Sequence, residues 1–366
     1  MAKIKVLIVD DSAFMRKLIS DFLSEHSRIE VIGTARNGED AIKKWRALCP
    51  DVITLDVEMP IMNGLDVLKV VMEEQPMPVV MLSSTTKEGA DTTLQAIQAG
   101  AVDFVAKPSG SISIDLHKIK AELIEKILSA SKANLPKITD IHQDHILFAS
   151  KNKKRFITSE KKASEKQSIK GNRHDASAKK VVCIGTSTGG PRALQQVLTS
   201  LPKDFGSPIL VVQHMPAGFT KSLANRLDSL SEIKVKEAED GELLQKGTAY
   251  IAPGGLHLEV KSIGTSLAVS LGQSAPRNGH RPSVDVLFES VSSLKHVSKI
   301  TVIMTGMGSD GAKGLIEMKK NGNVKAIAES QETSIVFGMP KSAIATNLVD
   351  EVVNVENIAE SIMNYI

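Results

Sequence analysis

Short apolar runs alternate with amphipathic stretches along most of this chain, and the alternation falls into two separate halves. In the first half the stretches between the runs place apolar residues at helical spacing, as Phe14, Leu18 and Phe22 do. The predicted strands are Ile4–Val9, Val31–Ile32, Val52–Leu55, Val79–Leu82 and Phe104–Ala106. Strands that alternate with helices predict parallel pairing with helical crossovers, so this half predicts a doubly wound α/β domain.

The alternation resumes at residue 179 after a segment rich in Lys, Ser and Asn. We therefore predict an N-terminal domain at 1–125, a flexible basic linker at 126–178 and a second domain at 179–366. The alternation of strands and helices in the second domain predicts a Rossmann-like α/β fold with a parallel sheet. Its predicted strands are Val181–Ile184, Ile209–Val212, Ile300–Met304 and Val324–Ala328.

The basic charge of the chain is concentrated in the linker. Residues 151–180 carry a local charge of +8, whereas the whole chain carries +3. Their one aromatic residue is Phe156, although single-stranded nucleic acids are bound by basic residues interleaved with aromatic ones. We therefore interpret the segment as a solvated linker and expect no nucleic-acid partner.

Cysteine content and hydropathy predict the compartment. Cys49 and Cys183 are the only cysteines, which is no disulfide framework and is typical of a reducing compartment. Cys183 lies inside an apolar run, so we interpret it as a core residue. Because no N-terminal leader and no run of membrane-spanning length is present, we expect a cytoplasmic protein without membrane insertion.

Acidic residues follow two predicted strands of the first domain. Asp10 and Asp11 end the first strand, and Asp56 ends the third. At one edge of a parallel sheet these carboxylates would repel each other unless a cation were present, and Mg²⁺ prefers such oxygen ligands. Ser83 and Lys107 end the fourth and fifth strands at the same edge.

This half of the chain resembles the receiver domain of response regulators, which is a flavodoxin-like fold. The resemblance lies in Val9-Asp10-Asp11-Ser12, Leu55-Asp56, Met59-Pro60 followed by Gly64, Ser83-Ser84 and Ala106-Lys107-Pro108. It implies that Asp56 accepts a phosphoryl group from a histidine kinase, with Lys107 paired to the phosphoryl charge and the Ser83 hydroxyl bonded to it. The implied Mg²⁺ ligands are Asp10, Asp11, Asp56 and the backbone carbonyl of Glu58.

A serine motif opens the second domain. Gly185-Thr186-Ser187-Thr188-Gly189 satisfies G-x-S-x-G, which exposes a serine on a tight strand-to-helix turn. Pro191 suits the first helical turn, whose N–H groups and dipole would lie near a developing oxyanion. A phosphate-binding glycine loop is an alternative, although the P-loop's Gly-Lys-Ser/Thr is missing. The motif alone favours neither interpretation.

Two further polar residues favour hydrolysis. His214 follows the run Ile209–Val212, and Asp310 lies in a glycine-rich turn after Ile300–Met304. Because sites in open α/β sheets form at the carboxyl ends of strands, Ser187, His214 and Asp310 would meet in one crevice. They would serve as nucleophile, base and orienting carboxylate, although the order differs from the Ser, Asp, His of α/β-hydrolases.

A second triad can be drawn from His257, His280 and Asp285, with Ser283 between the last two. Residues so close in sequence usually cannot converge on one substrate atom, so we interpret the 276–285 segment as a loop or substrate-binding element. No cluster has the spacing of zinc ligands, and we expect no cofactor for the hydrolysis.

The second half resembles the catalytic domain of the CheB family of chemotaxis protein-glutamate methylesterases. A receiver domain joined to this domain by a linker is the family architecture, and one departure is Thr186, where Ala or Ser is frequent. The motifs that match are Ile184-Gly185-Thr186-Ser187-Thr188-Gly189-Gly190-Pro191, Gln213-His214-Met215, Ala252-Pro253-Gly254-Gly255 with His257, His280-Arg281-Pro282-Ser283-Val284-Asp285, Thr305-Gly306-Met307-Gly308 with Asp310-Gly311, and Phe337-Gly338-Met339-Pro340.

The resemblance implies a phosphorylation-regulated serine hydrolase that serves adaptation in chemotaxis. It would demethylate glutamate methyl esters on chemoreceptors, releasing methanol, and deamidate specific glutamines. The backbone N–H of Met307 is the implied oxyanion donor, and Thr188 would shape the site. The implied partners are methyl-accepting chemotaxis receptors, a CheA-type histidine kinase as phosphodonor and a CheR-type methyltransferase acting in opposition.

Two other classes of protein compete with this interpretation. A DNA-binding response regulator would need a helix-turn-helix after the first domain, whereas residues 179–366 predict a strand-rich α/β domain. A signalling scaffold would keep the fold without the chemistry, and the intact set Ser187, His214 and Asp310 argues against it.

Overall fold

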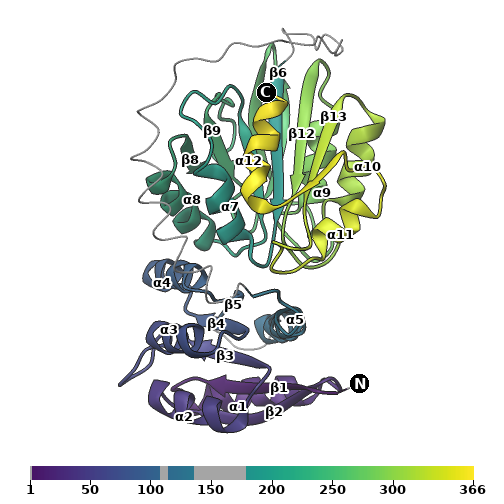
Figure 1. The fold of residues 1–366 in the computed structure, drawn as a ribbon. Coiled ribbons are helices and arrows are strands. Elements are labelled where there is room, and N and C mark those ends of the chain that lie inside the picture. The colour runs from purple at the N-terminus through teal and green to yellow at the C-terminus, as the bar shows by residue number, and fades with distance from the viewer. Residues whose placement is uncertain (1, 108–113, 136–178) are drawn as a thin grey trace, which may run out of the picture.

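The structure is a computed structural model that describes residues 2–107, 114–135 and 179–366. Figure 1 shows two α/β domains, with the N-terminal domain in purple and blue beneath the C-terminal domain in teal to yellow. Most of the predicted linker, residues 136–178, lies outside the described residues. Within the described part of the chain, no helix combines the length and apolar character needed to cross a membrane.

The N-terminal domain is a five-stranded parallel sheet in the order β2-β1-β3-β4-β5. This order confirms the doubly wound fold. Its elements are β1 (Ile4–Val9), α1 (Ala13–Ser24), β2 (Ile29–Ala35), α2 (Gly38–Leu48), β3 (Val52–Asp56), α3 (Gly64–Glu74), β4 (Val79–Ser83), α4 (Lys87–Gln98), β5 (Asp103–Ala106) and α5 (Ile114–Ala130).

Side-chain caps begin the first four helices of this domain. Ser12, Asn37, Asn63 and Thr86 each accept a backbone N–H of the first turn of α1 to α4. Such a cap satisfies one of the N–H groups that a helix start leaves free. The last helix, α5, continues to Ala130, so the boundary predicted at residue 125 falls inside it.

The C-terminal domain is a seven-stranded parallel sheet in the order β14-β13-β12-β6-β7-β9-β8, with a separate antiparallel pair β10-β11. This confirms the predicted parallel α/β sheet. Its elements are β6 (Lys179–Thr186), α7 (Gly190–Leu198), β7 (Ile209–Gln213), α8 (Phe219–Leu230), β8 (Lys234–Glu237), β9 (Thr248–Ile251), β10 (His257–Ile263), β11 (Ser266–Gly272), α9 (Val284–Ser292), β12 (Val297–Ile303), α10 (Ala312–Lys320), β13 (Val324–Glu329), α11 (Met339–Ile344), β14 (Glu351–Val353) and α12 (Val355–Asn364).

The strand order places a topological switch point at β6. The chain runs from β6 to β7 on one side and later returns to β12 on the other, so the direction of winding reverses at this strand. Ligand sites of open α/β sheets form outside the carboxyl ends of strands at such a switch point. The strands before Ser187, His214 and Asp310 are therefore the three adjacent strands of the switch point.

Aromatic and amide side chains join the two domains. Phe104 of β5 stacks on Phe219 of α8 with ring centroids 4.5 Å apart, and one buried apolar cluster runs through both domains. Gln98 at the end of α4 donates to the Gln195 side chain of α7. The face of the N-terminal domain formed by α4, β5 and α5 therefore packs on the C-terminal domain, as Figure 1 shows.

The packing predicts the cost of one core substitution. Phe288 of α9 is fully buried, so Phe288→Ala should lower the free energy of unfolding by about 3–5 kcal/mol. Phe14 of α1 is 64% exposed, so Phe14→Ala should change it by less than about 0.5 kcal/mol. Urea unfolding followed by circular dichroism measures both, and equal costs for the two substitutions would contradict the assigned packing.

Candidate active site

The turn between β6 and α7 holds Ser187 at the carboxyl end of a central strand. Gly189 has a φ of +78°, which side chains other than that of glycine rarely adopt. A Cβ on Gly190 would lie 1.9 Å from the Gln213 Oε1, so only glycine fits there. The last glycine of the serine motif and the glycine that follows it therefore allow the close approach that the turn requires.

Gln213 joins the serine turn to the following strand. Its Nε2 donates to the carbonyl oxygens of Ser187 at 3.0 Å and of His214 at 3.1 Å, and its Oε1 accepts from the Thr186 hydroxyl at 2.6 Å. The His214 N–H donates to the Thr186 carbonyl. Ser187 and His214 thus follow paired positions of two neighbouring strands, and the amide of Gln213 holds their backbones together.

His214 and Asp310 form a buried pair. The His214 Nε2 lies 2.8 Å from the Asp310 Oδ2, and the two side chains are 6% and 2% exposed. Burial alone would raise the pKa of Asp310, but the hydrogen bond and charge of His214, the Val284 N–H and the Ser283 hydroxyl hold that pKa well below its ordinary value. Asp310 is therefore a carboxylate at neutral pH.

The remaining ring nitrogen of His214 is the one free to accept a proton. Nδ1 is buried and has no partner among the described residues. Ser187 is partly exposed, and its hydroxyl likewise makes no hydrogen bond in the described part of the chain. The structure thus brings the Ser187 and His214 backbones together and joins His214 to Asp310, while the bond between hydroxyl and imidazole is not formed.

The loop after β12 closes the site beside Ser187. The Ser187 N–H donates to the Thr305 carbonyl, and a Cβ on Gly306 would lie 2.8 Å from that of Ser187. Gly306 accepts from the N–H groups of Gly338 and Met339. Met307, the residue expected to supply an oxyanion donor, therefore lies in a loop that contacts Ser187. Hydrogen bonds from the N-terminus of α11 hold this loop in place.

The second conceivable triad is not formed. The Ser283 hydroxyl donates to Asp310 at 2.8 Å, and Asp285 accepts the backbone N–H groups of Gly311 and Gly314. His257 contacts the Ala275 carbonyl through Nε2. Ser283 and Asp285 thus surround Asp310 instead of forming a separate site, and sequence reasoning missed this arrangement because no motif signals it.

A histidine of the same segment packs on the ring of His214. His280 and His214 are stacked with centroids 3.8 Å apart and planes 10° apart. Burial and the neighbouring His214 lower the pKa of His280 to about 4, so His280 is neutral at physiological pH. This contact was also missed from the sequence, which placed the segment in a loop or substrate-binding role.

The N-terminal domain holds an acidic cluster at the carboxyl edge of its sheet. Carboxylate oxygens of Asp10, Asp11 and Asp56 lie within 4.8 Å of one another. The Lys107 Nζ lies 2.9 Å from the Asp10 Oδ2 and 2.6 Å from the Asp56 Oδ2. The structure therefore gathers the three predicted carboxylates and the predicted lysine at one point.

Burial determines how readily Asp56 is protonated. It raises the pKa of Asp56 to about 6, although the hydrogen bond and charge of Lys107 oppose that shift.

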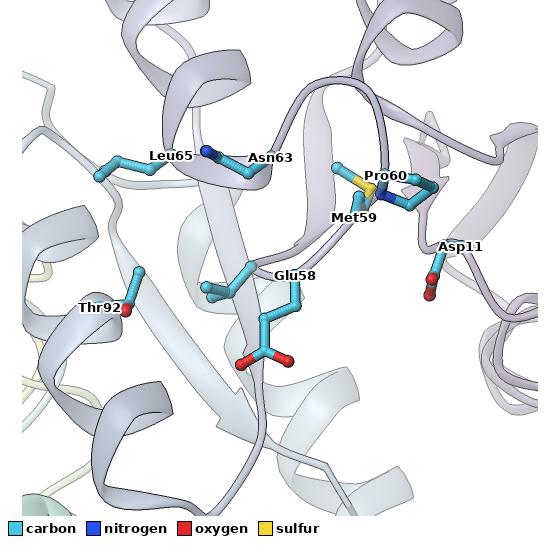
Figure 2. A pocket seen from close by; sticks show the side chains of 8 residues that line it. Asp11, Glu58, Met59, Pro60, Asn63, Leu65 and Thr92 are labelled. Carbon is cyan, nitrogen blue, oxygen red and sulfur yellow. The ribbon is translucent and has the colours of Figure 1, made fainter.

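Ser83, also predicted at this edge, points toward α4. Its hydroxyl lies 3.0 Å from the Gly89 carbonyl and donates to that oxygen. A hollow beside the cluster is lined by Asp11, which follows β1, and by residues of the loop after β3, such as Glu58 and Asn63 (Figure 2). Closely spaced oxygen ligands beside an open hollow fit a hard divalent cation.

The N-terminal domain reaches the serine turn. The Thr188 hydroxyl, next to Ser187, donates to the Asp103 Oδ2 of β5, and the Lys126 Nζ of α5 lies 3.2 Å from the Asp103 Oδ1. Thr188 and Asp103 are both buried in this contact. Thr188 is thus part of the contact between the domains and directly follows Ser187 in the serine turn.

Comparisons with known proteins identify the family of both halves of the chain. The family model described as CheB methylesterase matches residues 182–362, and the model described as response regulator receiver domain matches residues 6–120. Two relatives, each named protein-glutamate methylesterase/protein-glutamine glutaminase, come from Geobacillus kaustophilus and Halalkalibacterium halodurans. The first is 57% identical and covers 100% of this chain and 99% of its own; the second is 56% identical and covers 99% and 98%.

A solved structure supports the methylesterase match. The crystal structure of the Thermotoga maritima CheB methylesterase catalytic domain is 48% identical, with a TM-score of 0.50, and covers 52% of this chain and 100% of its own. Both halves of the sequence and the two parallel sheets agree with these matches. The chain therefore belongs to the CheB methylesterase family, as a member with a response-regulator receiver domain before the methylesterase domain.

Proposed function

We propose that this protein is a phosphorylation-regulated serine hydrolase that demethylates glutamate methyl esters and deamidates specific glutamines on chemoreceptors. The names of its relatives support the substrate class. The observation that carries the chemistry is the buried His214–Asp310 pair beside the serine turn. An ionised carboxylate that orients an imidazole, with a serine on the adjacent strand, is the arrangement that acyl transfer needs.

The reaction would begin at the Ser187 hydroxyl. Its oxygen attacks the ester carbonyl of the substrate while the His214 Nδ1 takes its proton, and Asp310 stabilises the resulting imidazolium through Nε2. The tetrahedral oxyanion would form against the Met307 N–H, near the N-terminus of α7, where the positive end of the helix dipole favours negative charge. Methanol leaves with the proton from His214, and an acyl-enzyme remains.

Water completes the cycle. His214 removes a proton from a water molecule that attacks the acyl-enzyme, and the proton returns to Ser187 as the glutamate carboxylate leaves. A glutamine side chain would follow the same path, with ammonia as the leaving group. This chemistry uses no bound cofactor.

The acidic cluster would carry phosphorylation. Asp56 is the proposed acceptor of the phosphoryl group, and Lys107 would pair with the added charge while the Ser83 hydroxyl turns from Gly89 toward it. The residues that would hold Mg²⁺ are Asp10, Asp11, Asp56 and the backbone carbonyl of Glu58. When bound, Mg²⁺ neutralises the charge that develops on the phosphoryl group.

Phosphorylation would act through β5. Lys107 directly follows this strand, which carries Asp103 and Phe104 against Thr188 and Phe219. We infer that these contacts restrict access to Ser187 and that loss of the Lys107–Asp56 ion pair on phosphorylation weakens them. The proposed setting is the cytoplasm, with a CheA-type kinase as phosphodonor and a CheR-type methyltransferase in opposition.

Ser187→Ala should lower the rate of methanol release from methylated receptor membranes by about three orders of magnitude or more, because the nucleophile is removed. Ser229→Ala, on the exposed face of α8, is the matched control and should retain the wild-type rate. Unchanged turnover by the Ser187 variant would favour a scaffold over an enzyme.

Asp56→Asn should abolish the increase in esterase rate that a small-molecule phosphodonor produces in the presence of Mg²⁺, because the acceptor carboxylate is missing. Chelation of Mg²⁺ in the wild-type protein should have the same effect. The measurement is the esterase rate with and without phosphodonor, and a variant that still responds would overturn Asp56 as the acceptor.

Phe104→Ala should raise the esterase rate of the unphosphorylated protein, because it removes the stack on Phe219 that holds the domains together. Couplings between sites usually change equilibria by about 5–150-fold, so an increase within that range is expected. Phe14→Ala, on the opposite side of the N-terminal sheet, is the control. A basal rate that equals that of the wild type would reject this contact as inhibitory.

A further inference from the structure

Two buried carboxylates, Asp310 of the candidate active site and Asp285, lie side by side. Asp310 is 2% exposed and Asp285 is 0% exposed. Burial, together with the neighbouring charge of Asp310, raises the pKa of Asp285 above its ordinary value. Like charges in a buried site need donors close to every oxygen, because uncompensated burial of a charge is costly. The donors that reach this pair therefore decide how Asp310 is held.

One donor reaches both carboxylates. Most donors bond only one of the two carboxylates: the Val284 N–H donates to Asp310, and the Gly314 N–H donates to Asp285. The Asn278 Nδ2, in contrast, lies 2.9 Å from the Asp285 Oδ2 and 3.2 Å from the Asp310 Oδ1. A side-chain amide nitrogen carries two hydrogens, so it can donate to both oxygens at once.

The backbone at Asn278 explains why an asparagine stands there. Arg277 and His280 exchange both backbone hydrogen bonds, at 3.0 and 2.9 Å, around a two-residue turn. Asn278 and Gly279 have φ values of +54° and +83°, as the central positions of a type I′ turn require, and Asn-Gly is the preferred pair there. The turn thus fixes the direction of the amide without adding charge.

The same turn also contacts His214, the partner of Asp310 in the candidate site. His280 ends the turn and stacks on the ring of His214, whereas Asn278 begins it and donates to Asp310. Arg277 pairs with Glu289 of α9 and anchors the turn to the body of the domain. The turn at 277–280 therefore contacts both members of the His214–Asp310 pair. It packs on the face of the His214 ring and donates to the Asp310 Oδ1, the oxygen that does not bond His214.

We propose that Asn278 is a positioning residue for the Asp310–His214 pair, whose amide bridges Asp285 and Asp310 and keeps the Asp310 carboxylate aligned on the imidazole. The proposal rests on the function proposed above for Ser187, His214 and Asp310. Asn278 acts through Asp310, so its loss should lower kcat and leave KM nearly unchanged, because the interaction matters most when His214 becomes charged.

Asn278→Asp gives the sharpest test. Asp-Gly also suits a type I′ turn, so the backbone is kept while the bridging donor is replaced by a third carboxylate. We expect kcat to fall by about 10-fold or more, the range expected for loss of a hydrogen bond to a charged group. Methanol release by the full chain with Mg²⁺ and phosphodonor is the assay, and circular dichroism checks that the variant is folded.

The pH profile separates positioning from a merely structural role. The titratable groups near His214 are Asp310, Asp285, His280 and, from α5, Glu125, with Lys126 acting on His280. An added carboxylate at 278 favours protonated imidazole, so the acid limb of kcat against pH should move to higher pH by up to about one unit. Asn321→Asp, at the exposed end of α10, adds the same charge at a distant place and should shift nothing.

Asn278→Ala completes the comparison. It removes the donor without adding charge, so kcat should fall with little movement of the acid limb. A wild-type kcat in both Asn278 variants, or a loss confined to KM, would overturn the positioning role. A wild-type protein that releases no methanol would instead contradict the proposed function, so the two failures can be told apart.

Discussion

The buried contact between His214 and Asp310 is the constraint on which the rest of the site depends. A carboxylate that is 2% exposed stays ionised only because donors surround it, and these come from α9, from the turn at 277–280 and from His214 itself. The order β12-β6-β7 brings the residues that follow these strands to one edge. The reversal of winding at β6 is therefore a property of the fold on which the site depends, because it places β7 and β12 on either side of the strand that leads to Ser187.

The fold could be predicted where apolar runs are long and bounded. Runs such as Ile4–Val9 and Ile209–Val212 are buried in parallel sheets, where continuous Val and Ile are expected. The hairpin β10-β11 was not predicted, although its alternating pattern around Gly264 could have indicated it. The helix α5 passes residue 125 because buried Ile127 and Ala130 continue its apolar face.

The site could be predicted only in its strand-end residues. Ser187, His214 and Asp310 each follow an apolar run, so sheet topology brings them together. The roles of Gln213, Asn278 and His280 depend on how turns fold back over the sheet, and a single sequence contains no local signal for such contacts. The bond between Thr188 and Asp103 joins two domains and likewise could not be predicted from either domain alone.

The central claim is that Ser187, His214 and Asp310 act as one unit, and active-site labelling tests it most directly. A fluorophosphonate forms a covalent bond with a serine hydroxyl only when a neighbouring base activates it. Incubation of the phosphorylated protein with such a reagent, followed by peptide mass spectrometry, should place one label on Ser187, and Asp310→Ala should slow the labelling markedly. Labelling at another residue, or at Ser187 with an unchanged rate in the Asp310 variant, would contradict the account.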